Sequence, residues 1–436
     1  DPRLIKTLGN PFGSAQMRQS KSHMHEALAA CGLSYIRSMR AKDVADVRPF
    51  AEELLREVGC VVVKPEAGAG SEFVSLCKSW EDVESAFALT LQNGYQTTQL
   101  LPLEYVVVQE YIDGEEYVVD TVSFGKHHVI TDVWRSVKFP VGMVSNRVRG
   151  CVEKEFQEKG VTLPKLPTTT LLYDRLDFIS HVSDSTAEPE AHAVCEYALR
   201  ALDALELING CAHCELRVRR HTKEPVLIEI NPRMQGDVPR STNLVGVDQY
   251  GVVAVIAHAL ALQDMLGTSA KAEQQRSGGG VAAVEGASSQ VVSSSCQDNG
   301  SNTAVVVSTH CGEPAGMPTC DGEDSNPVGC DLDIHKWFPV YYAPPTVPVT
   351  RSVVFLFANN AGYISEPGRR HLTQLPTFVR FTRSVLAAPA QPGFIVKVRE
   401  TTDLYSCPAA IILEGTKADI ERDIARIRTM QNNHVT

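Results

Sequence analysis

The stretch Val226–Gly236 reads VLIEINPRMQG. It decides the fold because the polar side chains of Glu229 and Asn231 interrupt an otherwise apolar predicted strand. Glu229 and Asn231 are two positions apart, so on a strand they face the same way. Glu215 lies on the preceding predicted strand, Cys214–Val218, and pairing of the two strands brings its carboxylate to that face. Two carboxylates and an amide oxygen suit Mg²⁺, with Mn²⁺ also acceptable. The alternative interpretation is a solvated acidic strand face.

Positively charged side chains are predicted at two strand ends. Arg233 directly follows the strand just described, where a guanidinium can hold a carboxylate or an oxyanion. The stretch Val61–Val74 (VVVKPEAGAGSEFV) is predicted to be strand–turn–strand, and Lys64 ends its first, apolar strand. A lone lysine there is costly unless it meets an anion. The backbone N–H groups of the following loop can cradle phosphates, and its candidate residues are Gly68, Gly70 and Ser71. Because no Gly-Lys-Ser/Thr follows, this is not a P-loop, and an ordinary glycine turn is the alternative.

A third polar feature is the stretch Val108–Tyr117 (VQEYIDGEEY), where an apolar strand stops at a polar hinge. The chain then turns through Asp113-Gly114 and presents Glu115 and Glu116. A purine needs backbone donors and acceptors between apolar walls, and a ribose suits a carboxylate acceptor. On its own this stretch is also typical of an ordinary hairpin.

The order of predicted elements favours an α+β or mixed-sheet fold over pure βαβ winding. Strands and helices alternate through residues 60–230, with strand–turn–strand pairs among them. Residues 187–208 and Ala418–Met430 have helical periodicity. Between 270 and 329, Ser, Gly, Asn, Asp and Pro replace large apolar residues, which predicts a disordered insertion or linker.

Composition limits the classes of partner. The chain has 436 residues and a net charge of −11, which argues against general binding to nucleic acid or to an acidic membrane. No stretch is long and apolar enough to span a bilayer. The 12 cysteines are scattered, so we interpret them as reduced thiols in a cytoplasmic protein. The basic cluster Arg217, Arg219 and Arg220 is interpreted as a solvated strand edge.

Taken in order, these stretches resemble the ATP-grasp superfamily, over roughly Lys21 to Leu262. The resemblance implies that ATP is held between two α+β subdomains. Within the superfamily, Gly210–Leu216 (GCAHCEL) is similar to the glycine, histidine and glutamate pattern of L-amino-acid ligases and carnosine synthases. The C-terminal block resembles the small closing domain that these proteins share with biotin carboxylases.

The resemblance implies a role for each matching residue. Contacts with ATP are implied for Lys21, Lys64, Gly68, Gly70, Ser71, Gln109, Glu110, Ile112 and Glu116. Ligation of Mg²⁺ is implied for Glu215, Glu229 and Asn231. Catalysis is assigned to Arg233 and Lys64, and contact with the substrate to His213, Gln235 and Asp237.

The resemblance also implies a domain order. Residues 1–58 form an N-terminal helical segment, 59–113 the small ATP-grasp subdomain, and 114–265 the large subdomain with the metal site. Residues 266–335 are the disordered linker and 336–436 the C-terminal closing domain. The chain starts at Asp1, and most of the Rossmann-like domain that precedes the ATP-grasp region in the family is missing, so a fragment is expected.

The implied activity is ATP-dependent ligation of a carboxylate to an amine through an acyl phosphate. The expected partners are small-molecule carboxylates and amines, and a homodimer is compatible with the sequence. A biotin-carboxylase-like carboxylase is one alternative, because Arg233, Gln235 and Asp237 resemble its bicarbonate-side pattern. A non-catalytic ATP-binding relic is the other.

Overall fold

The computed structural model describes residues 9–66, 73–93, 95–96, 101–140, 171–179, 189–236, 248–260, 350–358, 361–382, 395–398, 401 and 407–432. The chain divides into two compact units, Asp1–Ile256 with Leu332–Thr436, and Ala257–Asp331. Of the second unit only residues 257–260 are described, at the end of a helical segment over 249–260. The predicted linker, 266–335, lies outside the described residues. None of the described helices has the length and apolar character needed to cross a membrane.

The N-terminal part of the first unit joins two helices to a small sheet. Helix α1 covers Ala15–Gln19 and α2 covers Lys21–Ala30. Ser20 caps α2, because its hydroxyl accepts a hydrogen bond from the His23 N–H at 3.2 Å. The four-stranded antiparallel sheet has the order β1 (Ser38–Ala41), β6 (Val106–Glu110), β2 (Val61–Pro65) and β3 (Ser75–Cys77). Helices α3 (Arg48–Val58) and α4 (Trp80–Asn93) pack on it.

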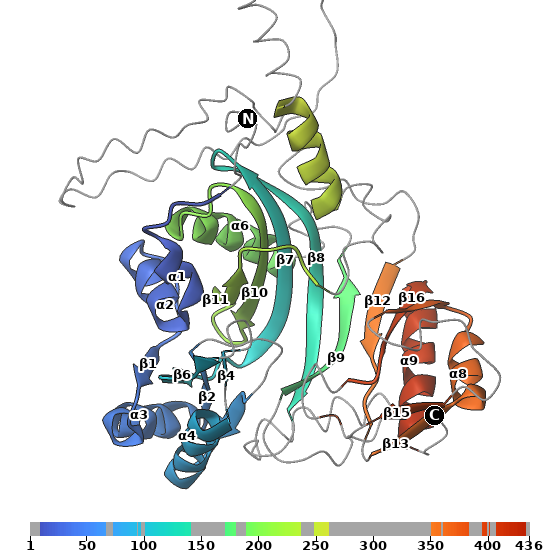
Figure 1. Cartoon of the computed structure of the whole chain (residues 1–436), viewed down its shortest axis with the longest axis horizontal. Coiled ribbons are helices and arrows are strands. Elements are labelled where there is room, and N and C mark those ends of the chain that lie inside the picture. Colours follow the sequence, from blue (N-terminus) through green and yellow to red (C-terminus); the bar gives the residue numbers. More distant parts are fainter. Residues whose placement is uncertain are drawn as a thin grey trace, which may run out of the picture. The chain divides into compact units, whose positions relative to one another are not determined.

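The large sheet carries most of the candidate site. Its eight strands have the order β11 (Pro225–Asn231), β10 (Gly210–Arg219), β7 (Gly114–Phe124), β8 (His127–Pro140), β9 (Leu171–Phe178), β12 (Thr350–Phe355), β16 (Ala410–Gly415) and β14 (Phe378–Thr382). Figure 1 shows β7 and β8 as long neighbouring strands beside β10. Helix α6 (Pro189–Ala204) packs against β7, β10 and β11. Buried Trp134, Tyr197 and Leu216 belong to the core between them.

C-terminal residues extend this same sheet. Strand β12 pairs with β9, and β16 pairs with β12 and β14. Helices α8 (Glu366–Thr373) and α9 (Lys417–Asn432) lie beside these strands (Figure 1). The remaining short strands are β4 (Tyr95–Gln96), β5 (Leu101–Pro102), β13 (Gly362–Ser365) and β15 (Ile395–Val398). The predicted α+β class is therefore confirmed, with antiparallel pairing in every described sheet.

Candidate active site

The register of β10 and β11 brings the predicted metal ligands to one face of the sheet. Glu215 lies directly opposite Glu229, and His213 directly opposite Asn231. Directly opposed side chains in an antiparallel pair share a face, so both carboxylates and the amide stand together, as the two-residue spacing predicted. The register shifts immediately after Glu215, and such bulges re-aim side chains next to functional sites.

Lysines approach these carboxylates from other elements. Lys21 Nζ at the start of α2 lies 3.9 Å from a carboxylate oxygen of Glu229, and Lys138 Nζ on β8 lies 3.5 Å from one of Glu215. Burial opposes ionisation of Glu215, but Lys138 and His213 outweigh burial and hold its pKa well below the ordinary value. Glu215 is therefore kept in the ionised form that a metal ligand requires.

The donor set fits a magnesium ion by its chemistry. Among the described residues no cluster of three or more His, Cys, Asp and Glu is arranged to hold a metal. The candidate set contains two carboxylates, Glu215 and Glu229, and its third oxygen comes from the amide of Asn231. Magnesium takes only a few protein oxygens and completes its shell with phosphate and water, so this set is sufficient.

Lys64 at the end of β2 is the most unusual cation of the site. The residue is 4% exposed, and in the described part of the chain it forms no ion pair and no side-chain hydrogen bond. Burial and, after it, nearby Lys21 lower the pKa of Lys64 to about 7, although Glu229, Glu215 and Glu66 act in the opposite direction. Lys21 and Lys64 are therefore the neighbouring cations of this site that could hold an anion.

Glu66 ties the start of α2 to the end of β2. Its carboxylate accepts hydrogen bonds from the hydroxyl of Ser20 and, at 2.8 Å, from that of Ser22. These contacts fix Lys21 next to Lys64. The loop residues that were predicted to cover the phosphates, Gly68, Gly70 and Ser71, lie outside the described residues.

The predicted hinge residues Gln109, Glu110 and Ile112 each contact other residues of the protein. The Gln109 side chain meets His25 Nε2 at 2.8 Å, and the Glu110 carboxylate accepts a hydrogen bond from Arg219 at 2.8 Å. Ile112 buries its side chain, and its carbonyl accepts a hydrogen bond from Arg217. Segment 111–113 thus joins the last strand of the small sheet to the first residues of β7.

Glu116, the predicted ribose acceptor, lies among three donors. Its Oε1 accepts from the Ser136 hydroxyl at 3.1 Å and pairs with Lys138 Nζ at 2.5 Å. Its Oε2 accepts from two nitrogens of Arg217, at 3.1 and 3.0 Å.

One interpretation of the sequence was wrong. Arg217 and Arg219 are not a solvated strand edge, since they pair with Glu116 and Glu110, and the Arg217 side chain is 11% exposed. Only Arg220 has a mostly exposed side chain. The sequence alone could not separate Arg217 and Arg219 from exposed Arg220, because the acids that pair with the first two lie about a hundred positions earlier in the chain.

Asp120 on β7 is a site residue that the sequence did not predict. It is fully buried, and its Oδ1 accepts a hydrogen bond from His213 Nδ1 at 2.8 Å. His213 Nε2 lies 3.5 Å from Glu215 Oε1, so the histidine links a buried aspartate to a candidate metal ligand. A lone aspartate within the apolar run of β7 was the available signal, since buried charges require partners.

Residues 232–236 form the turn that directly follows β11. Arg233 is exposed, and its guanidinium donates to the carbonyl of Met234 at 2.9 Å. Gln235 is buried, and its N–H donates to the side-chain oxygen of Gln249 at 3.0 Å. Gln249 also donates to carbonyls of β7 and β10, so it anchors this turn to the sheet. Asp237 lies outside the described residues.

Part of the chain matches a known domain family and a curated relative. The ATP-grasp domain family matches residues 45–237. Dapdiamide A synthase of Enterobacter agglomerans is 24% identical over 257 residues, which cover 59% of this chain and 50% of that protein. The chain therefore spans half the length of this curated relative.

Two solved structures are similar in fold. An L-amino acid ligase from Bacillus licheniformis has a TM-score of 0.53 at 14% identity, covering 97% of this chain and 73% of the other. A carboxyaminoimidazole ribonucleotide synthase from Aspergillus clavatus, solved with ATP, has a TM-score of 0.51 at 10% identity, covering 97% and 76%. Residues 45–237 thus match the ATP-grasp domain family, and the described α+β fold is similar to the folds of these two enzymes.

Proposed function

We propose that the protein is an ATP-dependent ligase that joins a small-molecule carboxylate to an amine through an acyl phosphate. The observation that carries the proposal is Lys64, a buried lysine without an ion pair in the described residues, beside Lys21 and opposite Glu215 and Glu229. Two cations beside two carboxylates suit a polyphosphate with its metal ion. The similarity to dapdiamide A synthase and to an L-amino acid ligase supports amino acids or related acids as substrates.

Each group has a role in this scheme. Lys21 and Lys64 bind phosphate oxygens of ATP, and the loop amides of Gly68, Gly70 and Ser71 cover them. Glu215, Glu229 and Asn231 would hold Mg²⁺, which neutralises phosphate charge when it is bound. Gln109, Glu110, Ile112 and Glu116 form the adenine and ribose side.

The reaction balances in two transfers. A carboxylate oxygen attacks the γ-phosphorus of ATP and ADP leaves, so the carboxylate becomes an acyl phosphate. The amine nitrogen then attacks the carbonyl carbon, phosphate leaves, and the nitrogen loses a proton. Exposed Arg233 holds the carboxylate and the developing oxyanion, while His213, Gln235 and Asp237 border the substrate.

We extend the proposal to the setting of the enzyme. The domain division at residues 58, 113, 265 and 335 follows from the family resemblance, the cytoplasmic location rests on the scattered cysteines, and the use of Mg²⁺ or Mn²⁺ rests on the oxygen ligands together with the resemblance. The net charge of −11 supports small molecules rather than nucleic acid as partners. A homodimer is compatible with this scheme.

Phosphate release over pairs of amino acids, with ATP and Mg²⁺, tests the proposal. We expect release that depends on an amino acid, and its loss in Lys64→Met and in Glu229→Gln. Lys42→Met is the matched control, because Lys42 is an exposed lysine paired with Glu104 at 3.0 Å. Release that requires bicarbonate and biotin instead would replace the ligase by a carboxylase. ADP binding without any release would leave a nucleotide-binding relic.

A further inference from the structure

Three arginines, Arg217 and Arg219 of β10 and Arg220 directly after it, lie against the connection between the two sheets. Each of them pairs with an acid of the segment 110–116, and the pairs are Arg217 with Glu116, Arg219 with Glu110, and Arg220 with Asp113. Residues 111–113 are the direct link from β6 to β7. The backbone takes part as well, because the Arg220 N–H donates to the Asp113 carbonyl at 2.8 Å.

Burial separates the three pairs. The side chains of Arg217 and Glu116 are 11% and 5% exposed, whereas those of Arg220 and Asp113 are 55% and 48% exposed. An exposed pair contributes little, because water screens it and its side chains keep their freedom. A buried pair is not screened in this way, so its contacts hold their geometry more firmly. The structural effect is therefore concentrated in Arg217.

Arg217 makes contacts in three directions. Its Nε and Nη2 donate to Oε2 of Glu116, and its Nη1 donates to the carbonyl of Ile112 at 2.8 Å. The guanidinium carbon also lies 5.5 Å from the centre of the Tyr111 ring. Only a guanidinium supplies a rigid fork with donors toward two separate acceptors, so a lysine can satisfy one contact but not both.

We propose that Arg217 is a positioning residue of the nucleotide site, which fixes the spacing between the hinge backbone and the Glu116 carboxylate. This inference rests on the proposed function, in which segment 109–112 meets the base and Glu116 meets the ribose. With both ends held by one side chain, the base and the ribose of a single nucleoside are recognised together. A hinge held in this way distinguishes adenine from other purines, because recognition by backbone groups depends on their fixed directions.

The surroundings allow Arg217 to be changed without stranding a buried charge. Lys138 and the Ser136 hydroxyl contact the other oxygen of Glu116, so the carboxylate keeps a cationic partner. Replacement of Arg217 by Met does remove the hydrogen bond that holds the Ile112 carbonyl. The variant Arg217→Lys retains the positive charge but loses the two-directional hydrogen bonding of the guanidinium. It therefore separates the effect of the charge from the effect of these hydrogen bonds.

Binding of ADP and of GDP, measured by calorimetry with Mg²⁺, tests the inference. We expect Arg217→Met to raise the Kd for ADP about tenfold, the loss typical of hydrogen bonds to a charged group. We expect Arg217→Lys to keep the unfolding midpoint of the wild type but to narrow the preference for ADP over GDP. Arg220→Met is the matched control, and it should change neither the Kd nor the preference.

The outcomes separate this inference from the proposed function. If the wild type binds neither nucleotide, both fail. If the wild type binds ADP and Arg217→Lys keeps the full preference over GDP, the positioning role fails and the proposed function stands. An equal loss of ADP and GDP affinity in both variants would also overturn it, because a purely structural role weakens all nucleotides alike.

Discussion

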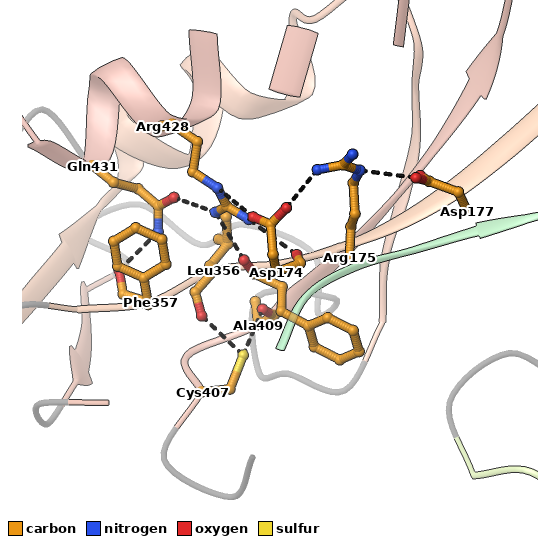
Figure 2. Close-up of polar contacts among 10 residues, drawn as sticks. Asp174, Arg175, Asp177, Leu356, Phe357, Cys407, Ala409, Arg428 and Gln431 are labelled. Atoms are coloured by element: carbon orange, nitrogen blue, oxygen red, sulfur yellow. Dashed lines mark hydrogen bonds and ion pairs between the residues drawn. The ribbon is translucent and has the colours of Figure 1, made fainter. Parts of the chain in front are cut away.

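Arg428 on α9 and Asp174 on β9 form an ion pair across 254 positions of the sequence, with both side chains 1% exposed. Figure 2 shows the guanidinium directed at the carboxylate, with Arg175 approaching Asp174 from another side. Arg428 Nη1 also donates to the Phe355 carbonyl at 2.9 Å and to Gln431 at 2.6 Å. Burial opposes ionisation of Asp174, but Arg428 and Arg175 outweigh it and lower its pKa. The last helix is thereby fastened to a strand of the large sheet.

Replacement of Arg428 by Met should destabilise the protein by roughly 3–5 kcal/mol, because it leaves the Asp174 charge buried with one partner fewer. Chemical denaturation followed by circular dichroism measures this loss. The double variant Arg428→Met with Asp174→Asn should recover part of it, since both charges are then removed. Arg370→Met is the control, because the Arg370 side chain is 64% exposed and lies 3.9 Å from Glu366 on the same helix. Equal stability of Arg428→Met and the control would contradict the assigned role.

The candidate site could be predicted where it depends on local geometry. Glu229 and Asn231 share a face because strands repeat every two residues, and Glu215 joins them because a short turn sets the register. Asp120 and Lys138 were missed because they reach the site through the pairing of β7, β8 and β10, which no local pattern encodes. The α+β class likewise followed from the order of elements, whereas the extension of the large sheet by β12 depends on contacts distant in sequence.

Gly114 lies where β7 starts against β10, and Gly114→Ala should destabilise this junction. A Cβ built on Gly114 would lie 1.7 Å from the backbone oxygen of Val218, so the strands would have to separate. Overpacking of this kind typically costs about 1–3 kcal/mol, and a backbone neighbour cannot move aside cheaply. Thermal unfolding compared with Gly13→Ala, whose Cβ meets nothing within 4 Å, measures the effect. Matching midpoints for the two variants would show that the junction tolerates a side chain.

Asp120 and Asp132 should respond differently to the same substitution. Burial and neighbouring Asp120 raise the pKa of Asp132 well above its ordinary value, whereas Asp120 accepts a hydrogen bond from His213 at 2.8 Å. An asparagine imitates a protonated Asp132, so Asp132→Asn should be tolerated. Asp120→Asn removes the counter-charge of His213 and should be the more destabilising variant.

The pH dependence has a definite sign. An acid whose folded pKa is raised stabilises the fold while it is protonated, and this contribution is lost as pH rises through the folded pKa. The stability of Asp132→Asn relative to the wild type should therefore increase between about pH 5 and pH 8. Unfolding free energies at the two pH values measure the difference. A relative stability that falls with pH would mean that Asp132 is ionised in the folded protein.

When a nucleotide binds, Lys64 should take up a proton from the solvent. Burial, together with Lys21, lowers the pKa of Lys64 to about 7, so at about pH 8 its amine is mostly neutral in the free protein. An anion placed beside it favours the charged form and raises the pKa. We therefore expect net proton uptake on ADP binding at that pH, measured by calorimetry in buffers that differ in ionisation enthalpy.

Two variants make this result specific to Lys64. Lys64→Met should bind ADP more weakly and without the extra proton, whereas Lys42→Met, which changes an exposed lysine, should retain the uptake of the wild type. The uptake should also shrink toward about pH 6, because Lys64 is already protonated below its free pKa. An uptake that persists in Lys64→Met would assign the proton to another group, and phosphate would then not lie beside Lys64.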